Sequence, residues 1–176
     1  MIIAISSGHG LHVSGAHTAL ANEVIEARRV TQDVVRRLRE LGVWAFEFHD
    51  DSSRNQNDNL NAIVRWHNER IRTLDVSIHF NAIDGIRPGG IGVEVLHRTP
   101  EAADLARRVS AAIASAGQLI NRGAVNDGRA NVRFLNQAQR PAILIEVGFI
   151  NSETDMRNYR RNYDEIVNAI ARTLAN

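Results

Sequence analysis

Four side chains of this sequence have types and positions suited to metal-assisted hydrolysis. His9 follows a short apolar run, His79 ends another, and Glu146 lies inside a third, Ala-Ile-Leu-Ile-Glu-Val. Glu23 lies near the start of a segment with helical periodicity. Two imidazoles and one carboxylate, with water in the fourth position, form a known type of catalytic zinc site. Such a set of ligands therefore makes zinc the predicted cofactor, with the open position holding the water to be activated.

The position of Glu23 on its predicted helix supports a role inside the fold. At about 100° per residue, the apolar residues of segment 20–41 cluster around one direction. Glu23 falls inside that apolar stripe, whereas Glu26 falls on its flank. A solvated glutamate belongs on the flank or the back of a helix, so Glu23 needs a partner in the interior. Because it is near the helix start, it should face the loop that carries His9.

Glu146 is the candidate for acid–base chemistry. A carboxylate within an apolar run is costly to bury unless it pairs, binds a metal or shifts its pKa. Pairing with one of the many arginines is an alternative for Glu146, and a favourable position at the helix N-terminus is an alternative for Glu23. His12 and His17 lie in the loop that follows the first apolar run, and either is an alternative to His9 as ligand.

The other histidines indicate structure more than chemistry. His67 lies beside Trp66 on a predicted helix and is expected to pack in the core. The side chains of His49, Asp50 and Asp51 are consecutive and so diverge in direction, which favours a solvated loop over a metal cluster. His97 precedes Arg98 after a strand and is expected to point to solvent.

Composition limits the class of protein and its partners. The chain has 176 residues, of which 44% are hydrophobic, enough for one domain with a core of its own. Its 21 basic and 20 acidic residues nearly cancel, so charge indicates neither a nucleic-acid partner nor a membrane partner. There is no cysteine, which excludes thiolate ligands. The N-terminus lacks the features of a secretory signal, and no apolar run approaches the ~20 residues of a membrane span.

The order of predicted elements indicates an α/β fold. Strands alternate with helices, but no helix fits between the strands at 74–79 and 92–96, so the sheet should be mixed and mostly parallel. Helices are expected on both faces of this single layered domain. The strands are predicted at 2–6, 43–48, 74–79, 92–96, 132–135 and 142–147, and the helices at 20–41, 57–71, 99–115, 152–159 and 163–174. In open α/β sheets, ligands bind outside the carboxyl ends of the strands, which is where the candidate residues lie.

These motifs resemble the N-acetylmuramoyl-L-alanine amidase type 3 family, and most closely the catalytic domains of phage endolysins. Four segments carry the resemblance: Ser-Gly-His-Gly around His9, the helix start at Glu23, Ser-Ile-His-Phe-Asn-Ala around His79, and Glu-Val-Gly-Phe-Ile-Asn from Glu146. The resemblance covers nearly the whole chain. It implies that residues 1–176 form a zinc amidase catalytic domain, with His9, Glu23 and His79 as the zinc ligands and Glu146 as the catalytic residue.

The resemblance also implies a substrate and a place of action. The substrate would be peptidoglycan, cut between the lactyl group of N-acetylmuramic acid and L-alanine of the stem peptide, with Arg122 or Asn121 as candidate contacts to that peptide. The enzyme would be a monomer made in the cytoplasm. Because no export signal is visible, the expectation is an endolysin released by a holin, or a truncated chain. Because no wall-binding domain is visible, the chain would be an isolated catalytic domain or a naturally short enzyme. A non-catalytic wall-binding module and a different zinc peptidase or sugar deacetylase are the alternatives.

Overall fold

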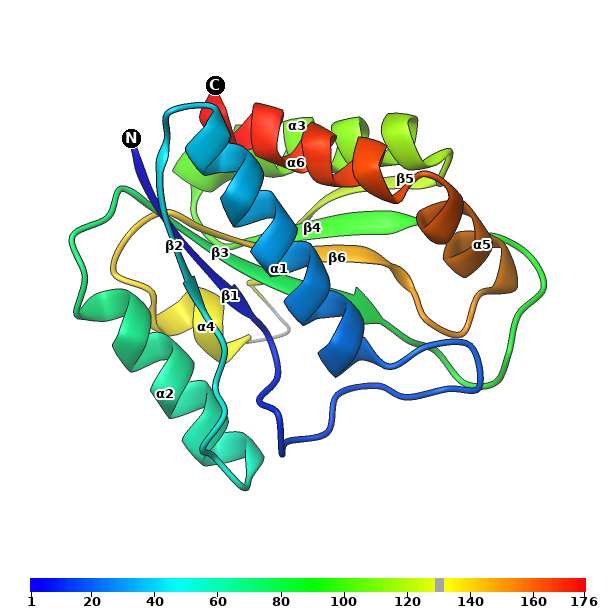
Figure 1. The fold of residues 1–176 in the computed structure, drawn as a ribbon, viewed down its shortest axis with the longest axis horizontal. Coiled ribbons are helices and arrows are strands. Elements are labelled where there is room, and N and C mark those ends of the chain that lie inside the picture. Colours follow the sequence, from blue (N-terminus) through cyan, green and yellow to red (C-terminus); the bar gives the residue numbers. More distant parts are fainter. Residues whose placement is uncertain (129–131) are drawn as a thin grey trace.

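The computed structural model describes residues 1–128 and 132–176, which build a six-stranded sheet in the order β2-β1-β3-β6-β4-β5 (Figure 1). The strands are β1 (Ile2–Ser7), β2 (Trp44–Phe48), β3 (Leu74–Asn81), β4 (Val93–His97), β5 (Asn121–Asn126) and β6 (Ala142–Phe149). The helices are α1 (Glu23–Glu40), α2 (Gln56–Asn68), α3 (Pro100–Gly117), α4 (Arg133–Gln137), α5 (Glu153–Arg161) and α6 (Tyr163–Ala175).

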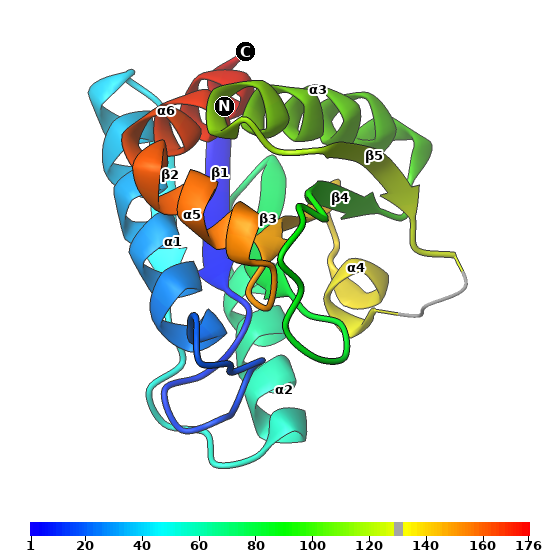
Figure 2. The same cartoon turned by 90° about the vertical axis from the view of Figure 1, so that its right-hand side faces the viewer.

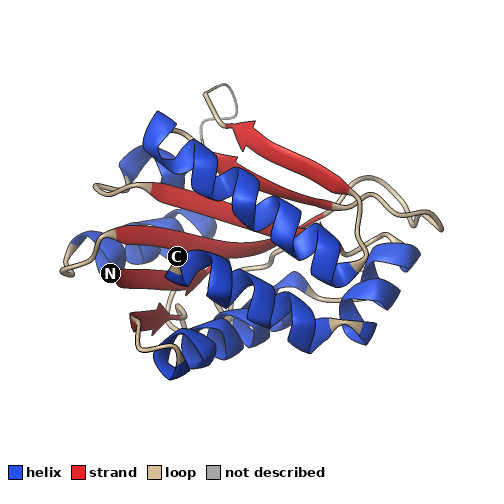
Figure 3. Ribbon diagram, turned by 90° about the horizontal axis from the view of Figure 1, so that it is seen from above, coloured by secondary structure: helices blue, strands red, loops and turns tan. Residues whose placement is uncertain are grey.

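The sheet is mixed and mostly parallel, as predicted. Strands β2, β1, β3 and β6 run parallel to one another, and β4 pairs antiparallel with β6. Helices α1, α3 and α6 cover one face, whereas α2 and α4 lie on the other (Figures 2 and 3). The predicted α/β fold with helices on both faces is therefore confirmed. Among the described helices, none combines the length and apolar character that crossing a membrane requires.

Alternation along the central strands decides which side chains enter the core and which face the site. Val76, Ile78 and Phe80 of β3 are buried in the large core formed with α1 and α6. In β6, Leu144 packs instead in a smaller cluster with Phe134 of α4. Because successive side chains of a strand point to opposite faces, His79 and Glu146 share the face covered by α2 and α4.

Two predictions about secondary structure were wrong or incomplete. Residues 132–135 were expected to form a strand, but residues 133–137 form the short helix α4. Phe134 and Leu135 are both buried in the smaller cluster, whereas neighbours in a strand would point to opposite faces. Strand β5 was not predicted, because its sequence Asn-Arg-Gly-Ala-Val-Asn is polar and it lies at the exposed edge of the sheet.

His67 packs in the interior, as predicted, and it does so within a buried hydrogen-bond network. Its Nδ1 lies 2.8 Å from Oδ1 of Asp75, and its Nε2 lies 3.0 Å from Oγ of Ser6. Arg72 donates to both oxygens of Asp75, at 2.9 and 3.0 Å. Burial lowers the pKa of His67 and outweighs the attraction of Asp75. The imidazole is therefore neutral, donating to Asp75 and accepting from Ser6, and the network joins α2 to β1 and β3.

This neutral, buried imidazole predicts a loss of stability in mild acid. The unfolded chain takes up a proton on His67 near pH 6.5, whereas the folded chain, with its lowered pKa, does not. The contribution is thus fully present above about pH 6.5 and declines below it, by up to ~1.4 kcal/mol per pH unit. Urea unfolding at pH 7.5 and 5.5 should show a smaller decline for His67→Gln than for the parent chain. Equal declines in the variant and the parent chain would contradict the assignment of a neutral, buried imidazole to His67.

Candidate active site

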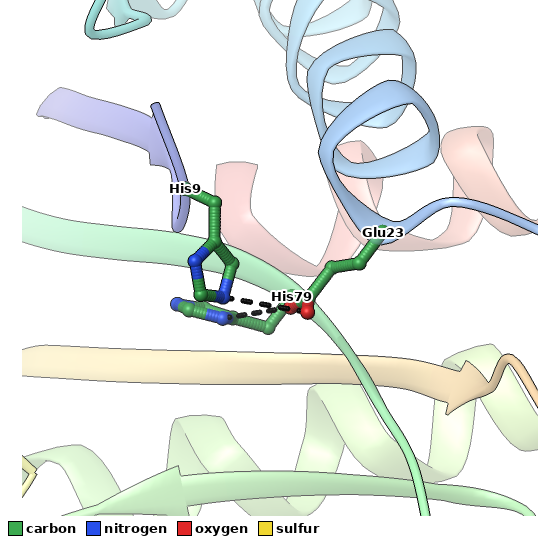
Figure 4. A group of neighbouring side chains, drawn as sticks. All are labelled: His9, Glu23 and His79. Carbon is green, nitrogen blue, oxygen red and sulfur yellow. Dashed lines mark hydrogen bonds and ion pairs between the residues drawn. The ribbon is translucent and has the colours of Figure 1, made fainter. Parts of the chain in front are cut away.

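Three predicted ligands converge at the carboxyl ends of the central strands (Figure 4). Nε2 of His9 lies 3.3 Å from Oε2 of Glu23, and Nδ1 of His79 lies 3.1 Å from Oε1 of Glu23. Their candidate ligand atoms all lie within 4.8 Å of one another. Glu23 is buried, whereas both histidines are partly exposed. The group is therefore open to solvent from the side of the two imidazoles.

Each side chain is positioned by a different element. His9 follows β1 directly, His79 lies near the end of the adjacent strand β3, and Glu23 is the first residue of α1. The side chain of Asn22 caps that helix by accepting from the backbone N–H of Ile25. Because α1 begins at this cap, the side chain of Glu23 points across the end of the sheet. This agrees with the expectation that Glu23, on the apolar stripe of the helix, faces the interior.

The carboxylate of Glu23 is held by backbone donors as well as by the histidines. The N–H of Ala16 donates to Oε2 at 2.8 Å, and the N–H of Phe80 donates to Oε1 at 3.2 Å. Burial opposes ionisation of Glu23, but hydrogen bonds from His79 and His9 outweigh it and hold the pKa of Glu23 well below the usual range. The group is therefore an ionised carboxylate whose orientation is set before any ligand binds.

The spacing of these atoms fits a zinc ion. Two ligands about 2.0–2.1 Å from one zinc in tetrahedral geometry lie roughly 3.4 Å apart. The separations of 3.3 Å from His9 to one carboxylate oxygen and 3.1 Å from His79 to the other are close to that value, and the three candidate ligand atoms all lie within 4.8 Å of one another. Two neutral imidazoles and a carboxylate also suit zinc chemically. His9, Glu23 and His79 could therefore hold the metal without large rearrangement.

Glu146 lies beside this group on the neighbouring strand. It is the register partner of His79 in the parallel pairing of β3 with β6. No ion pair of Glu146 is found among the described residues, and its Oε2 is buried without a hydrogen-bond partner. Burial, followed by the negative charges of Glu23 and Glu94, raises its pKa to about 8. No arginine among the described residues neutralises Glu146.

Sequence reasoning did not identify Glu94. It continues a row of polar side chains across three neighbouring strands, formed by His79, Glu146 and Glu94. Glu94 is the register partner of Glu146 in the antiparallel pairing of β4 with β6. Asn81 donates to one of its oxygens at 2.9 Å, and Arg122 donates to the other at 2.7 Å. The alternation in Val-Glu-Val-Leu-His could have revealed it, because Val93 and Val95 are buried while Glu94 faces the other side.

The two stem-peptide candidates on β5 differ in their surroundings. Arg122 is exposed, and its guanidinium is paired with Glu94 at 2.7 Å and lies 5.3 Å from the ring centre of Phe149. The side chain of Asn121 accepts from the N–H of Gly123 and bonds to Ser110. Asn121 therefore serves the internal structure of the β5 edge, and Arg122 is the better placed of the two.

The structure also separates the alternative ligands from the group at the strand ends. His12 and His17 are exposed and lie outside the three-residue group. Glu26 accepts a hydrogen bond from the hydroxyl of Tyr159 at 2.9 Å, away from the histidines. Among the candidates considered from the sequence, the described residues thus favour His9 and Glu23.

Two predictions about other histidines were wrong. His97 is buried, not solvent-facing, and its Nδ1 donates to the carbonyl of Thr99 at 3.2 Å, because it is the last residue of the inner strand β4. His49 is half-buried and its Nδ1 lies 2.9 Å from Oγ of Ser7. Asp50 is buried, and its carbonyl accepts from the N–H of Leu11 at 2.8 Å. Only Asp51 of that trio is exposed, and the other two support the His9 loop.

Gly8 offers a direct test of how His79 is placed. A Cβ atom built on Gly8 would lie 1.9 Å from the His79 ring, so only glycine permits this close approach. We expect Gly8→Ala to displace the imidazole and to weaken zinc binding by at least the roughly 10–100-fold typical of changes beside metal ligands. Competition with a zinc-selective chelator measures this affinity, and Gly89→Ala, where the added Cβ meets open space, is the control. Unchanged affinity in Gly8→Ala would contradict the placement of His79.

The fold and this cluster together define an α/β domain with a candidate hydrolytic metal centre at the carboxyl ends of its sheet. Residues 3–176 match the family model described as N-acetylmuramoyl-L-alanine amidase. The chain belongs to this family. An uncharacterized 38.4 kDa protein of Clostridium perfringens is 31% identical over 171 residues, which are 95% of this chain and 48% of that protein. The chain thus spans about half the length of this curated relative.

Solved structures share the fold over nearly the whole chain. The catalytic domain of the CD27L endolysin targeting Clostridia difficile has a TM-score of 0.87 at 22% identity, covering 99% of this chain and 96% of that one. The amidase AmiC2 of Nostoc punctiforme has a TM-score of 0.76 at 27% identity, covering 98% of this chain and 94% of that one. Both likenesses agree with the fold described above.

Proposed function

We propose that this chain is a zinc-dependent amidase that cuts peptidoglycan between the lactyl group of N-acetylmuramic acid and L-alanine. The observation that carries the proposal is the convergence of His9, Glu23 and His79 beside Glu146, a carboxyl with no ionic partner among the described residues. Membership of the amidase family supports the choice of bond. All four side chains come from one chain, which supports a catalytic unit that acts as a monomer.

The residues divide the work of hydrolysis between them. A zinc ion held by His9, Glu23 and His79 would supply Lewis-acid activation of a water molecule and of the scissile carbonyl. Glu146 takes a proton from the attacking water and returns it to the leaving nitrogen as the carbon–nitrogen bond breaks. One water is consumed, and the products are the lactyl carboxylic acid and the free amine of the stem peptide.

The buried carboxylate of Glu23 contributes by its fixed position. The backbone N–H groups of Ala16 and Phe80 already hold both of its oxygens, so little ordering is needed when a cation binds. A charge placed in advance costs less to organise during the reaction than one that must first be oriented. Arg122, held by Glu94 at the other end of the row, is proposed to contact the stem peptide.

The cell wall of bacteria is the proposed site of action, in the manner of an endolysin. The likeness to an endolysin catalytic domain supports this role. We also propose that residues 1–176 form a zinc amidase catalytic domain, which the family match over residues 3–176 supports. Release from the cytoplasm through a holin remains part of this proposal.

Digestion of purified walls tests the function. We expect turbidity to fall while new free amino groups appear on L-alanine, with no new reducing ends. Removal of zinc by a chelator should stop the reaction, and added zinc should restore it. Wall binding without new amino groups would instead indicate a non-catalytic module. Released acetate or cleavage within the stem peptide would indicate a deacetylase or a peptidase.

A further inference from the structure

The ring of His9 is not oriented through its second nitrogen. Its Nε2 lies 3.3 Å from Glu23, whereas its Nδ1 is buried and has no hydrogen-bond partner among the described residues. Histidines that bind metals usually donate the other ring N–H to a carboxylate or a carbonyl, and this bond fixes the ring. Since the described part of the chain offers no such bond, the placement of His9 depends on the backbone of the His9 loop, residues 8–13.

The His9 loop is fastened to neighbouring segments on both sides of the imidazole. Before His9, the N–H of Gly8 donates to the carbonyl of Ile78 in β3 at 2.9 Å. After it, the N–H of Leu11 donates to the carbonyl of Asp50 at 2.8 Å. One end of the loop is thus fixed to the central sheet, and the other end depends on where Asp50 lies.

Asp50 is held in place through its own carboxylate, which is buried. Its Oδ1 accepts from the N–H groups of Ser52 and Ser53, at 3.0 and 3.1 Å, and from the Ser52 hydroxyl at 3.1 Å. Its Oδ2 accepts from the side-chain amide of Asn59, a buried residue of α2, at 3.0 Å. Bonds of this kind from an aspartate to the backbone just after it shape a tight turn. They therefore fix the carbonyl of the same residue, which receives the Leu11 N–H.

The His9 loop also packs directly against Asp50 and Asn59. A Cβ atom added to Gly10 would lie 3.0 Å from the carbonyl oxygen of Asp50 and 3.1 Å from Nδ2 of Asn59. Arg28 of α1 donates to the same carbonyl at 2.9 Å. Neither Asp50 nor Asn59 belongs to the three-residue group of candidate ligands. Any effect of this pair on a bound metal must therefore pass through the loop.

Resting on the proposed function, we infer that Asp50 is a positioning residue for the zinc ligand His9, and that Asn59 holds it in that role. The contacts run from Asn59 in α2 through the carboxylate and carbonyl of Asp50 to the N–H of Leu11, two positions after His9. A metal site must be held within about 0.5 Å of its productive geometry. Loosening this connection therefore weakens zinc binding, although every ligand remains in the chain.

The affinity of the folded chain for Zn²⁺ alone, measured by competition with a chromogenic chelator, tests the inference. Asp50→Ala removes the acceptor of the Ser52, Ser53 and Asn59 bonds, and zinc affinity should fall by about 10–100-fold, as is typical of changes outside the ligand set. Asp50→Asn should lose far less. Its amide oxygen can accept the same turn bonds, and the amide of Asn59 can rotate to become the acceptor of the other bond.

Asp155→Ala is the matched control. Asp155 is a carboxylate as deeply buried as Asp50, but it accepts from the backbone N–H groups of Ile91 and Gly92, in the segment before β4. Both alanine variants should lower the melting temperature, whereas only Asp50→Ala should lower zinc affinity. Asn59→Ala is the independent second variant in case Asp50→Ala does not fold, and its zinc affinity should fall in the same direction.

The outcomes separate this inference from the proposed function. Parental zinc affinity in both Asp50→Ala and Asn59→Ala, or an equal loss in Asp155→Ala, would overturn the positioning role. Hydrolysis of walls by the parent chain would then leave the amidase function standing. An Asp50→Asn variant that loses as much affinity as Asp50→Ala would also overturn the role, because the charge and not the hydrogen bonds would be responsible. A parent chain that neither binds zinc nor digests walls would reject the proposed function and this inference with it.

Discussion

Replacing Glu146 by glutamine is expected to lower kcat by about a hundredfold to ten-thousandfold while zinc remains bound. The amide of glutamine keeps the size of the side chain but cannot accept a proton from water or return one to the leaving nitrogen. Glu146 lies beside His79 in the sheet but is not one of the three clustered ligands. Activity on an N-acetylmuramoyl-L-alanine substrate and zinc content per chain are the two measurements, made on the same preparation.

Glu94→Gln is the matched control for this experiment. Glu94 is the cross-strand neighbour of Glu146 and is also an acid in the same row, but its oxygens are taken by Asn81 and Arg122. Its replacement should therefore reduce kcat far less than that of Glu146. A Glu146→Gln variant with the parental kcat, or a Glu94→Gln variant that loses as much, would show that the acid–base role is assigned to the wrong carboxyl.

The grouping of the candidate residues could be predicted from the sequence where local pattern and general topology agree. His9, His79 and Glu146 follow or occupy short apolar runs, and such runs become parallel strands whose carboxyl ends meet. Glu23 could be chosen over Glu26 because helical periodicity is a strong local signal. In the structure Glu23 contacts both histidines and Glu26 contacts Tyr159, so Glu23 stays the predicted ligand.

Features that depend on contacts distant in the sequence could not be predicted. Phe134 and Leu135 are both apolar for a reason visible only in three dimensions, since they pack with Ile63 of α2. Asp50 looked like a loop residue, but it is buried by the His9 loop and by Asn59, which donates to its carboxylate at 3.0 Å. Short segments carry too little periodicity to separate helix from strand.

The row of acids across β6 and β4 shows the same limitation. Glu94 and Glu146 are 52 positions apart in the printed numbering, and nothing in the local pattern pairs them. Only the antiparallel register of β4 against β6 brings them together. The link between β3 and β4 without a helix predicted a mixed sheet, but it did not predict that β4 would skip β3 and pair with β6.

Zinc content should distinguish the two glutamates at the start of α1. We expect Glu23→Ala to lose zinc, because it removes the carboxylate that contacts both histidines at 3.3 and 3.1 Å. The loss of affinity should exceed the roughly 10–100-fold caused by changes outside the ligand set, and hydrolysis should fall with it. Elemental analysis after dialysis against buffer with a weak chelator, normalised to protein, is the measurement.

Glu26→Ala provides the control in the first turn of the same helix. It removes only the acceptor of the Tyr159 hydroxyl, which should lower stability by about 1 kcal/mol and leave zinc in place. If Glu26→Ala lost the metal and Glu23→Ala kept it, the assignment of the carboxylate ligand would be wrong. The comparison is decisive because both residues sit in the first turn and carry the same charge. Any general effect on the helix dipole would change the two variants alike, whereas loss of a ligand would change only one.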